Sequence, residues 1–299
     1  MAGIGLGIND LIKRTMRRFQ GGHSAKAEVR EVSFNYHSAY LDRIVPLTIF
    51  LPEDYTPEKE SCRLLLFNDG QDMPALKMRE TLQNLFDTRK IRPTIVVGIH
   101  ANQNRIREYG TASQADYKGR GDLAQAHTDF VTEELLPYLR SQYPLSEMPL
   151  HTAYAGCSLG GLSALDMVWA RPDIFGLAGT FSGALWWRSV PVSDDDPDGS
   201  RIIHDIIGRS APRFGMRFWF ECGTLDEEED RNNNGIIDSI DDTVDLINVL
   251  KNHGYRNNGN EIRYVEVPGG EHNQATWAMV LPDFLCWAFG GENFEFRES

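Results

Sequence analysis

The sequence is short of the features that mark several large classes of protein. It has four cysteines, at positions 62, 157, 222 and 286, and no CxxC pair, so neither a zinc site nor a dithiol redox motif is indicated. Lysine and arginine total 30 against 43 aspartates and glutamates, and the formal net charge of −13 argues against a nucleic-acid partner. No apolar run approaches the roughly 18 residues of a membrane span, so we expect no transmembrane segment.

Length and composition leave room for one large domain. The chain has 299 residues, of which 41% are hydrophobic and 24% charged, as in folded globular proteins. No internal repeat or low-complexity linker divides it, and we expect an N-terminal extension at residues 1–25 and a single domain at residues 26–292. The basic residues of the N-terminus follow its short apolar stretch, which is not the order of a signal peptide, so we expect a cytoplasmic protein.

Apolar segments of strand length alternate with helical patterns from about residue 60 onward. Six continuous apolar runs are typical of strands buried on both faces; they cover residues 62–69, 93–100, 150–158, 175–183, 217–224 and 261–270. Four segments carry apolar residues at helical spacing, at residues 122–142, 160–170, 239–253 and 274–289. This alternation predicts an α/β fold with a doubly wound, mostly parallel sheet.

Three further segments add detail to this fold. Residues 29–36 and 43–52 are β-rich and precede the alternating part, so we predict an antiparallel N-terminal hairpin at one edge of the sheet. Pro137 should kink the helix predicted at residues 122–142 near its end. Residues 100–121 lack periodicity, and long ordered loops of this kind often bind a ligand or cover a site.

The segment Gly156-Cys157-Ser158-Leu159-Gly160 matches the pattern GxSxG. The match alone is weak, but an apolar strand ends at Cys157 and a helix of small residues starts at Gly160. This is the context of a nucleophile elbow, in which a strained turn exposes a reactive serine and the glycines relieve crowding. We therefore predict that Ser158 is a nucleophile rather than a serine in an ordinary turn.

A serine nucleophile needs a base, and the base needs an acid that orients it. His272 lies between the last predicted strand and the last helix, at the carboxyl edge of the sheet. His253 sits at a helix end, where we interpret it as a cap. Asp226 follows the strand at residues 217–224 and is the favoured acid. Four more carboxylates crowd the same turn and stay open as alternatives: Glu227, Glu228, Glu229 and Asp230.

A tetrahedral intermediate would also need two backbone N–H donors. Leu159, directly after the nucleophile, should supply one of them. The other should come from the loop after an earlier strand, where the sequence reads Asn68-Asp69-Gly70-Gln71-Asp72. We expect Gly70 to let the chain turn there so that the N–H of Gln71 points inward.

With these residues in place, the chain resembles a family of esterases within the α/β-hydrolases, which includes enterochelin esterases, feruloyl esterases, S-formylglutathione hydrolases and mycolyltransferases. The matching segments are LLLFNDGQD, EYGTASQADYKGRGD, FVTEELLPYL, AGCSLGGLSAL, FSGALWW, CGTLDE and PGGEHNQATWAMVLPDFLCWAF, which span nearly everything from about residue 30 to 290. The resemblance implies an α/β-hydrolase fold and a serine carboxylic-ester hydrolase that works through an acyl-enzyme. By position, Ser158, Asp226 and His272 match its triad, and Gln71 and Leu159 match its oxyanion donors.

Two other functions are compatible with this resemblance. An acyltransferase would share every one of these residues and differ only in the acceptor. A catalytically inactive hydrolase fold could serve for binding, but an intact serine, acid and histidine in the right order argue against it. We expect a small-molecule ester as substrate and no cofactor for catalysis.

Six residues are candidates for contact with that ester: Tyr109, Tyr117, Lys118, Arg120, Trp186 and Trp187. The first four lie in the long loop and suit an anionic or polar substrate. The two tryptophans suit aromatic acyl groups or sugar rings, with packing in the core as the alternative. Siderophore, feruloyl, acyl-sugar and thioester substrates all stay open.

An acidic and amide-rich stretch follows Asp226 and departs from the family pattern. Its oxygen-bearing residues have the spacing of an EF-hand calcium loop: Asp230, Asn232, Asn234, Ile236 through its carbonyl, Asp238 and Asp241. Gly235 stands at the tight turn of such a loop. Asp241 replaces the glutamate of EF-hands, as in the dockerin loops that this stretch also resembles. We predict a structural calcium ion here rather than a solvated acidic turn.

Overall fold

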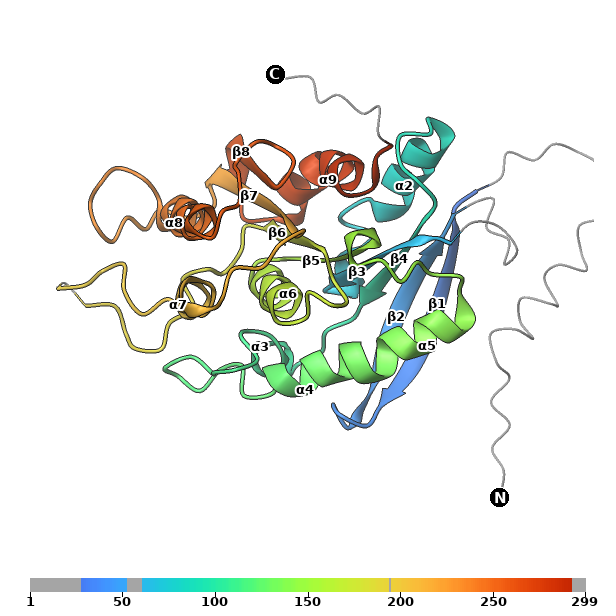
Figure 1. The fold of residues 1–299 in the computed structure, drawn as a ribbon, viewed down its shortest axis with the longest axis horizontal. Coiled ribbons are helices and arrows are strands. Elements are labelled where there is room, and N and C mark those ends of the chain that lie inside the picture. The colour runs from blue at the N-terminus through green and yellow to red at the C-terminus, as the bar shows by residue number, and fades with distance from the viewer. Residues whose placement is uncertain (1–27, 53–60, 194, 292–299) are drawn as a thin grey trace, which may run out of the picture.

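The computed structural model describes residues 28–52, 61–193 and 195–291. Eight of its strands form one sheet in the order β1-β2-β4-β3-β5-β6-β7-β8 (Figure 1). They are β1 (Arg30–Ser38), β2 (Arg43–Leu51), β3 (Arg63–Asn68), β4 (Thr94–Ile99), β5 (Thr152–Cys157), β6 (Leu177–Phe181), β7 (Arg217–Leu225) and β8 (Ile262–Glu271). The strands from β3 to β8 are parallel. The predicted mostly parallel sheet is therefore confirmed.

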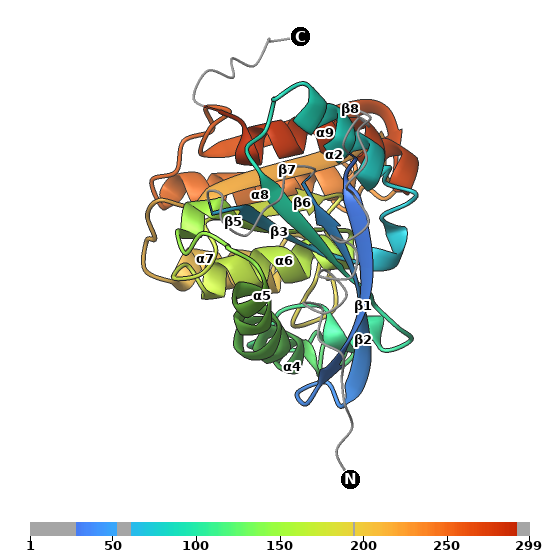
Figure 2. The same ribbon diagram turned by 90° about the vertical axis from the view of Figure 1, so that its right-hand side faces the viewer.

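Helices cover both faces of this sheet, which explains why its strands are continuous apolar runs. Every side chain of β4, β5 and β6 is buried. α2 (Met78–Asp87) and α9 (Gln274–Phe289) pack on one face, while α6 (Leu159–Ala170), α7 (Ile202–Arg209) and α8 (Asp238–Asn252) pack on the other (Figure 2). The sheet is thus doubly wound, as the alternating pattern predicts.

The predicted hairpin forms one edge of the sheet. β1 and β2 pair antiparallel, with Val32 opposite Ile49, and β2 pairs antiparallel with β4, with Thr48 opposite Gly98. Side chains of β1 alternate between half-buried and exposed, because only one face of this edge strand is covered. On the covered face, the ring of Phe34 stacks on that of Tyr138 with centroids 5.3 Å apart.

The helix predicted at residues 122–142 is interrupted differently from the expectation. It consists of α4 (Ala124–Asp129), a π-helical stretch (Phe130–Leu135) and α5 (Leu136–Gln142). Pro137 lies in the first turn of α5, where its missing N–H is tolerated. The irregularity therefore precedes the proline. α2, α7 and the short α3 (Arg105–Glu108) were not predicted.

The predicted domain boundaries lie at the margins of the structure. The N-terminal extension at residues 1–25 falls outside the described residues, and the single domain at residues 26–292 stays a prediction. Within the described ranges, no helix combines the length and apolar character needed to cross a lipid bilayer. The loops after β3, β5, β7 and β8 emerge at one edge of the sheet, because parallel strands share their carboxyl ends.

Candidate active site

Ser158 occupies a strained turn between β5 and α6. Its backbone angles are φ 55° and ψ −125°, which a residue with a side chain adopts only when its surroundings enforce it. Two hydrogen bonds hold the turn: the Ser158 N–H donates to the Phe181 carbonyl at 2.8 Å, and the Ser158 carbonyl accepts the Ala184 N–H at 3.1 Å. A Cβ on Gly156 would lie 2.5 Å from the carbonyl carbon of Gly160. The glycines are thus needed where strand and helix approach each other, as the elbow pattern predicts.

The loop after β3 lies against this elbow. The side-chain amide of Asn68 donates to the Gly160 carbonyl at 2.8 Å, and a Cβ on Gly160 would lie 2.8 Å from Asp69 Oδ2. Leu159 is the first residue of α6, so its N–H has no partner within the helix. Gln71 lies in the single 3₁₀ turn Gly70–Asp72 beside it. The two expected oxyanion donors therefore belong to neighbouring segments.

The turn in this loop is made by a different residue from the one expected. Asp69, not Gly70, adopts the left-handed conformation, with φ 58° and ψ 49°. Gly70 is required for another reason, since a Cβ there would lie 2.4 Å from the carbonyl carbon of Gly98. Asp69 is held from two sides: Arg105 pairs with its carboxylate, and its N–H donates to the Tyr109 hydroxyl at 3.1 Å.

His272 is placed by the turn between β8 and α9. Asn273 caps α9, with its side-chain oxygen accepting the Thr276 N–H at 3.0 Å. The His272 ring meets Trp277 edge to face, with centroids 5.3 Å apart and planes at 82°. Burial lowers the pKa of His272, the charge of Asp226 opposes this, and the nearby Arg105 guanidinium adds to the lowering. The imidazole is therefore neutral at neutral pH, the form that a general base needs.

Asp226 follows β7 directly, and its charge acts on His272. Its N–H donates to the Gly223 carbonyl at 3.3 Å, while both carboxylate oxygens are buried with no hydrogen-bond partner within 3.5 Å. Asp226 and His272 therefore do not form a hydrogen bond of ordinary geometry here, and such contacts often align when substrate binds. The neighbouring Glu227 instead faces Ser239 at the start of α8, and burial raises the pKa of Glu227 to about 7. This geometry favours Asp226 among the five candidate acids.

A cavity of about 460 Å³ opens beside the His272 side chain. Its lining is rich in carboxylates and comes from the last residues of β7 and β8 and the loops after them: Leu225, Glu227, Glu228, Glu271, His272 and Asn273. It therefore adjoins His272 at the carboxyl edge of the sheet.

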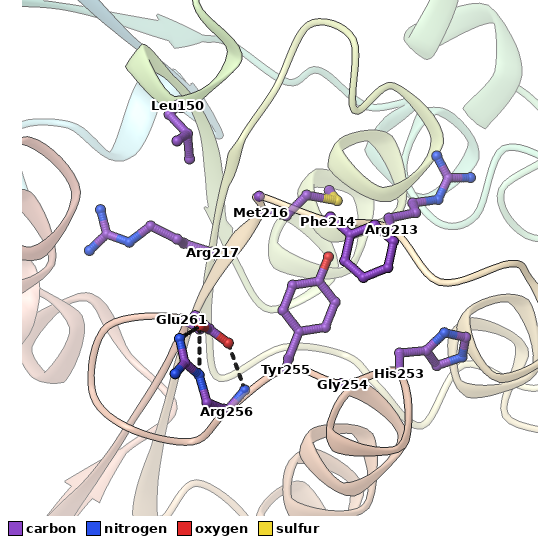
Figure 3. Close-up of a pocket in the computed structure, with 11 residues that line it drawn as sticks. Leu150, Arg213, Phe214, Met216, Arg217, His253, Gly254, Tyr255, Arg256 and Glu261 are labelled. Atoms are coloured by element: carbon purple, nitrogen blue, oxygen red, sulfur yellow. Dashed lines mark hydrogen bonds and ion pairs between the residues drawn. The ribbon is translucent and has the colours of Figure 1, made fainter.

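A cavity of about 380 Å³ lies elsewhere (Figure 3). Leu150 precedes β5, Met216 and Arg217 stand at the start of β7, and Glu261 precedes β8. These residues belong to the amino ends of the strands, opposite the edge that carries Ser158. This cavity is therefore separate from the candidate active site.

The two predicted substrate segments pack against each other through an aromatic cluster. The Arg120 guanidinium lies over both tryptophans, with its central carbon 5.2 Å from the ring centroid of Trp186 and 4.9 Å from that of Trp187. Arg120 also donates to Asp116 at 2.6 Å. The N–H of Tyr117 donates to the Arg188 carbonyl at 3.0 Å. These contacts bring the long loop and the segment after β6 into one wall.

Only part of this wall is accessible to a substrate. Trp186 and Tyr117 are 39% and 41% exposed, and the Lys118 ammonium lies 5.4 Å above the Tyr117 ring. Tyr109 and Trp187 are fully buried, which differs from the expected substrate contact. The Tyr109 hydroxyl accepts the Asp69 N–H, and the Trp187 ring packs against Gly110 and Gly121 of the long loop. Large aromatic side chains contribute most to stability when they are buried in this way.

The predicted calcium loop folds around its first residue. The Asp230 carboxylate accepts the N–H groups of Asn234 and Gly235 at 3.1 and 2.8 Å. Asp241 accepts hydrogen bonds from the side-chain amides of Asn232 and Asn234 at 3.2 and 2.7 Å. The first, third, fifth and twelfth residues of the loop therefore converge.

Two further residues of this loop also make polar contacts. Ile236, whose carbonyl is the predicted ligand, donates its N–H to the Asn234 side-chain oxygen at 2.7 Å. The Asp238 carboxylate accepts the backbone N–H of Arg231 at 2.9 Å. The Arg231 guanidinium also pairs with Asp198 and Asp242. The Arg231 guanidinium also lies 3.2 Å from the carboxylate of the loop residue Asp238, and so places a positive charge beside the loop aspartates.

Several residues of the site were not predicted. Ser182, directly after β6, also has a left-handed φ of 43°, and its hydroxyl oxygen accepts the Trp277 indole N–H at 2.8 Å. Glu221 lies fully buried in the middle of β7. A glutamate within the apolar run RFWFEC was a signal that could have found it, since a buried carboxyl needs a reason. Arg105 carried no comparable signal, because its partner Asp69 lies 36 residues away in the sequence.

A family model described as "Putative esterase" matches residues 38–288. The iron(III) enterobactin esterase of Escherichia coli O6:H1 is 33% identical over 177 residues, which are 58% of this chain and 40% of that protein. The chain thus spans less than half the length of this relative.

Two solved structures share the fold. The enterobactin esterase of Shigella flexneri aligns with a TM-score of 0.67 and 22% identity, over 88% of this chain and 59% of that one. The S-formylglutathione hydrolase of Staphylococcus aureus aligns with a TM-score of 0.61 and 16% identity, over 90% and 99% of the two chains. At these identities the likeness supports the α/β-hydrolase architecture alone.

Proposed function

The chain belongs to this esterase family, and from that premise we propose that it hydrolyses carboxylic esters through an acyl-enzyme on Ser158. The observation that carries the proposal is the strained Ser158 turn, with the Leu159 and Gln71 segments beside it and the neutral His272 imidazole at the same carboxyl edge of the sheet. Strain of this kind persists where the surroundings enforce it, which is common at catalytic sites.

The reaction follows from the roles of these residues. Ser158 Oγ attacks the ester carbonyl carbon while His272 takes the hydroxyl proton, and the N–H groups of Leu159 and Gln71 bind the oxyanion. The C–O bond then breaks, the alcohol leaves with the proton from His272, and an acyl-Ser158 ester remains. Water attacks this ester with His272 as base, which releases the carboxylic acid and restores the serine. Asp226 stabilises the imidazolium at both steps.

A covalent probe tests this proposal directly. A fluorophosphonate should label the wild-type chain once, with mass spectrometry locating the adduct on Ser158. Ser158→Ala should be neither labelled nor active on p-nitrophenyl acetate, while keeping its melting temperature. Ser141→Ala, which changes an exposed serine in α5, is the control. An active, folded Ser158→Ala variant would refute the serine mechanism.

The ester itself can be narrowed by competition among substrates. The name of the Escherichia coli relative makes iron(III) enterobactin one candidate, beside feruloyl, acyl-sugar and thioester substrates. The exposed ring of Trp186, with Arg120 over it, suits an aromatic or polar group. Ranking kcat/KM over these classes, with and without an added alcohol acceptor, identifies the substrate and separates hydrolysis from acyl transfer.

We also propose that the loop at residues 230–241 binds a structural calcium ion. The fit rests on donor chemistry: the Asp230 carboxylate and the Asn232 amide oxygen both accept the Asn234 N–H, and the Asp241 carboxylate lies beside both asparagines. Calcium takes six to eight oxygens of these kinds in flexible geometry. Asp230, Asn232, Asn234, the Ile236 carbonyl, Asp238 and Asp241 would hold it. Calcium would supply charge neutralisation, and the residues of the loop would order the segment that begins at Asp226.

We also propose that the protein works in a reducing compartment, the cytoplasm, where cysteines stay as free thiols. All four are free and buried in the described structure. This supports the proposal of a cytoplasmic protein, since free thiols are usual where disulfides are kept reduced.

A further inference from the structure

Glu221 places a second carboxyl group near Asp226, the proposed catalytic acid. Asp226 Oδ1 would lie 2.8 Å from a Cβ on Gly223, which is two residues after Glu221 and so on the same face of the strand. Glu221 lies in β7, five residues before Asp226, and is 1% exposed. Its side chain is on the same face of the strand as Trp219, which packs against Phe284 of α9 with ring centroids 5.7 Å apart. Both carboxyl oxygens of Glu221 are buried with no hydrogen-bond partner within 3.5 Å.

Ser182 links the two carboxyl groups. Its N–H donates to the main-chain carbonyl of Glu221 at 2.8 Å, which fixes the end of β6 against β7. Its hydroxyl lies beside the side chains of both Glu221 and Asp226. The oxygen of that hydroxyl already accepts the Trp277 indole N–H. The Ser182 hydroxyl therefore has one proton to donate, and the carboxyl groups of Glu221 and Asp226 compete for it.

A count of donors shows what this arrangement lacks. Glu221 and Asp226 bring four buried oxygens without partners. The donors that face them are the hydroxyl of Ser182, the ring N–H of His272 and the N–H groups of Gly223 and Ser182, and the Ser182 N–H already donates to the Glu221 main-chain carbonyl. Two ionised carboxylates would leave buried negative charge without enough donors, which is costly. A proton on one of the carboxyl groups supplies the missing donor and removes one charge.

We infer that Glu221 is a positioning residue, protonated during catalysis, whose carboxyl O–H donates to Asp226 and thereby aims the other Asp226 oxygen at His272. This inference rests on the proposed esterase function. It gives Asp226 a second partner within β7, in addition to the histidine.

The electrostatic surroundings agree with this assignment. Burial, and then the charge of Asp226, raise the pKa of Glu221 to about 8, so Glu221 keeps its proton at neutral pH. The other titratable groups near it are His272 beyond Asp226 and the thiols of Cys157 and Cys222. Burial raises the pKa of both thiols well above the ordinary value, so they add no charge at neutral pH.

Two substitutions separate hydrogen bonding from packing. Glu221→Leu fills the space without a donor, and we expect kcat to fall by about tenfold or more, the rate equivalent of one lost hydrogen bond, with KM little changed. Glu221→Gln has a similar shape and a neutral amide that can donate to Asp226, so it should restore most of the lost rate. A Gln variant as impaired as Asp226→Asn would show that Glu221 acts as an ionised acid and would overturn the inference.

The pH profile gives a readout that packing alone does not move. Wild-type kcat should fall above pH 8, as Glu221 ionises and loses the proton that it donates. Glu221→Gln cannot ionise, so its rate should stay level there. An unchanged alkaline limb in Glu221→Gln would contradict the inference.

Infrared spectroscopy tests the proton without relying on activity. The difference spectrum between wild type and Glu221→Gln at pH 7 should contain the C=O stretch of a protonated carboxylic acid. If the Gln variant does not fold, the same band should disappear from the wild type on raising the pH through 8. Absence of the band at pH 7 would refute a protonated Glu221. Activity in Ser158→Ala would instead refute the esterase mechanism, so the two failures are distinguishable.

Discussion

Arg105 holds Asp69 in a bidentate ion pair, with Nε–Oδ1 and Nη2–Oδ2 distances of 2.7 Å each. Asp69 is the residue with left-handed backbone angles directly before the Gly70–Asp72 turn. The pair therefore connects α3 to the loop that presents the Gln71 N–H. Paired charge-assisted bonds of this geometry are stronger than single ones, so they can hold a strained turn in place.

Breaking this pair should reduce catalysis more than stability. We expect Arg105→Ala to lower kcat about tenfold to a hundredfold, because a displaced oxyanion donor loses its alignment with the intermediate. Arg105→Lys should recover little, since an ammonium cannot make both bonds. Arg107 lies in the same helix as Arg105 and makes an exposed ion pair with Asp122. Arg107→Ala, which breaks that pair, is the matched control. Equal effects of the Arg105 and Arg107 changes would contradict this role.

Gly70 should not tolerate even a methyl group. Its added Cβ would meet the backbone of Gly98 at 2.4 Å, and backbone atoms of a central strand cannot move aside cheaply. We expect Gly70→Ala to lower both the melting temperature and kcat. Gly208→Ala in α7 is the control, since the nearest atom to its new Cβ lies 3.7 Å away. It should stabilise the protein by about 0.5–1 kcal/mol through helix propensity, measurable by urea unfolding.

The two candidate histidines should differ sharply in kinetics. His272→Ala should reduce kcat by at least about three orders of magnitude, as loss of a triad member does. His253→Ala should change it little, because that ring packs on Trp169 at a centroid distance of 5.8 Å, at the end of α8. The reverse result would mean that the loop after β8 does not carry the base.

The acidic limb of kcat/KM should report the His272 imidazole. The pKa of His272 is lowered, chiefly by burial, so wild-type activity should persist below pH 6.5 before protonation removes the base. The charge of Asp226 opposes that lowering. Asp226→Asn should therefore move the limb of the residual activity to still lower pH. A shift to higher pH would show that Asp226 does not act on His272.

Stability should also fall in acid because of buried histidines. Burial lowers the pKa of His127 to about 3, so the folded state binds no proton there while the unfolded chain does below its ordinary pKa of 6.5. Stability should thus decline as pH falls from 6.5 towards 3, by about 1.4 kcal/mol per pH unit for this residue. His127→Gln, which can keep the bond to Tyr154, should make the decline shallower. A His127→Gln variant with the same slope as the wild type would refute the assignment.

Calcium should couple the loop at residues 230–241 to the active site. Chelation should lower the melting temperature and the esterase rate, and added calcium should restore both, because an ion that binds only the folded state stabilises it by mass action. Asp230→Ala or Asp241→Ala should mimic chelation and abolish any further response to it. Calorimetry that shows no binding in millimolar calcium would end this proposal.

The sequence by itself determined the order of elements and the places of the candidate site residues within that order. Continuous apolar runs predicted the parallel strands, because only residues buried on both faces need to be apolar throughout. The GxSxG pattern located Ser158 in the turn between a strand and a helix, because glycines are needed where these two neighbouring segments come too close for a Cβ. His272 followed from its place between the last strand and the last helix.

Only the tertiary structure decided how those residues are held. The pairs Arg105–Asp69 and Trp277–Ser182 join residues 36 and 95 positions apart, and no local pattern encodes such contacts. The same is true of burial: Tyr109 and Trp187 looked like substrate contacts, but the packing of two loops encloses them. Glu221 became significant only when β6 and β7 paired and brought its carboxyl group beside Ser182 and Asp226. Periodicity and local motifs report interactions between near neighbours in the chain, whereas the sheet brings distant segments to one edge and so decides which polar groups must satisfy each other.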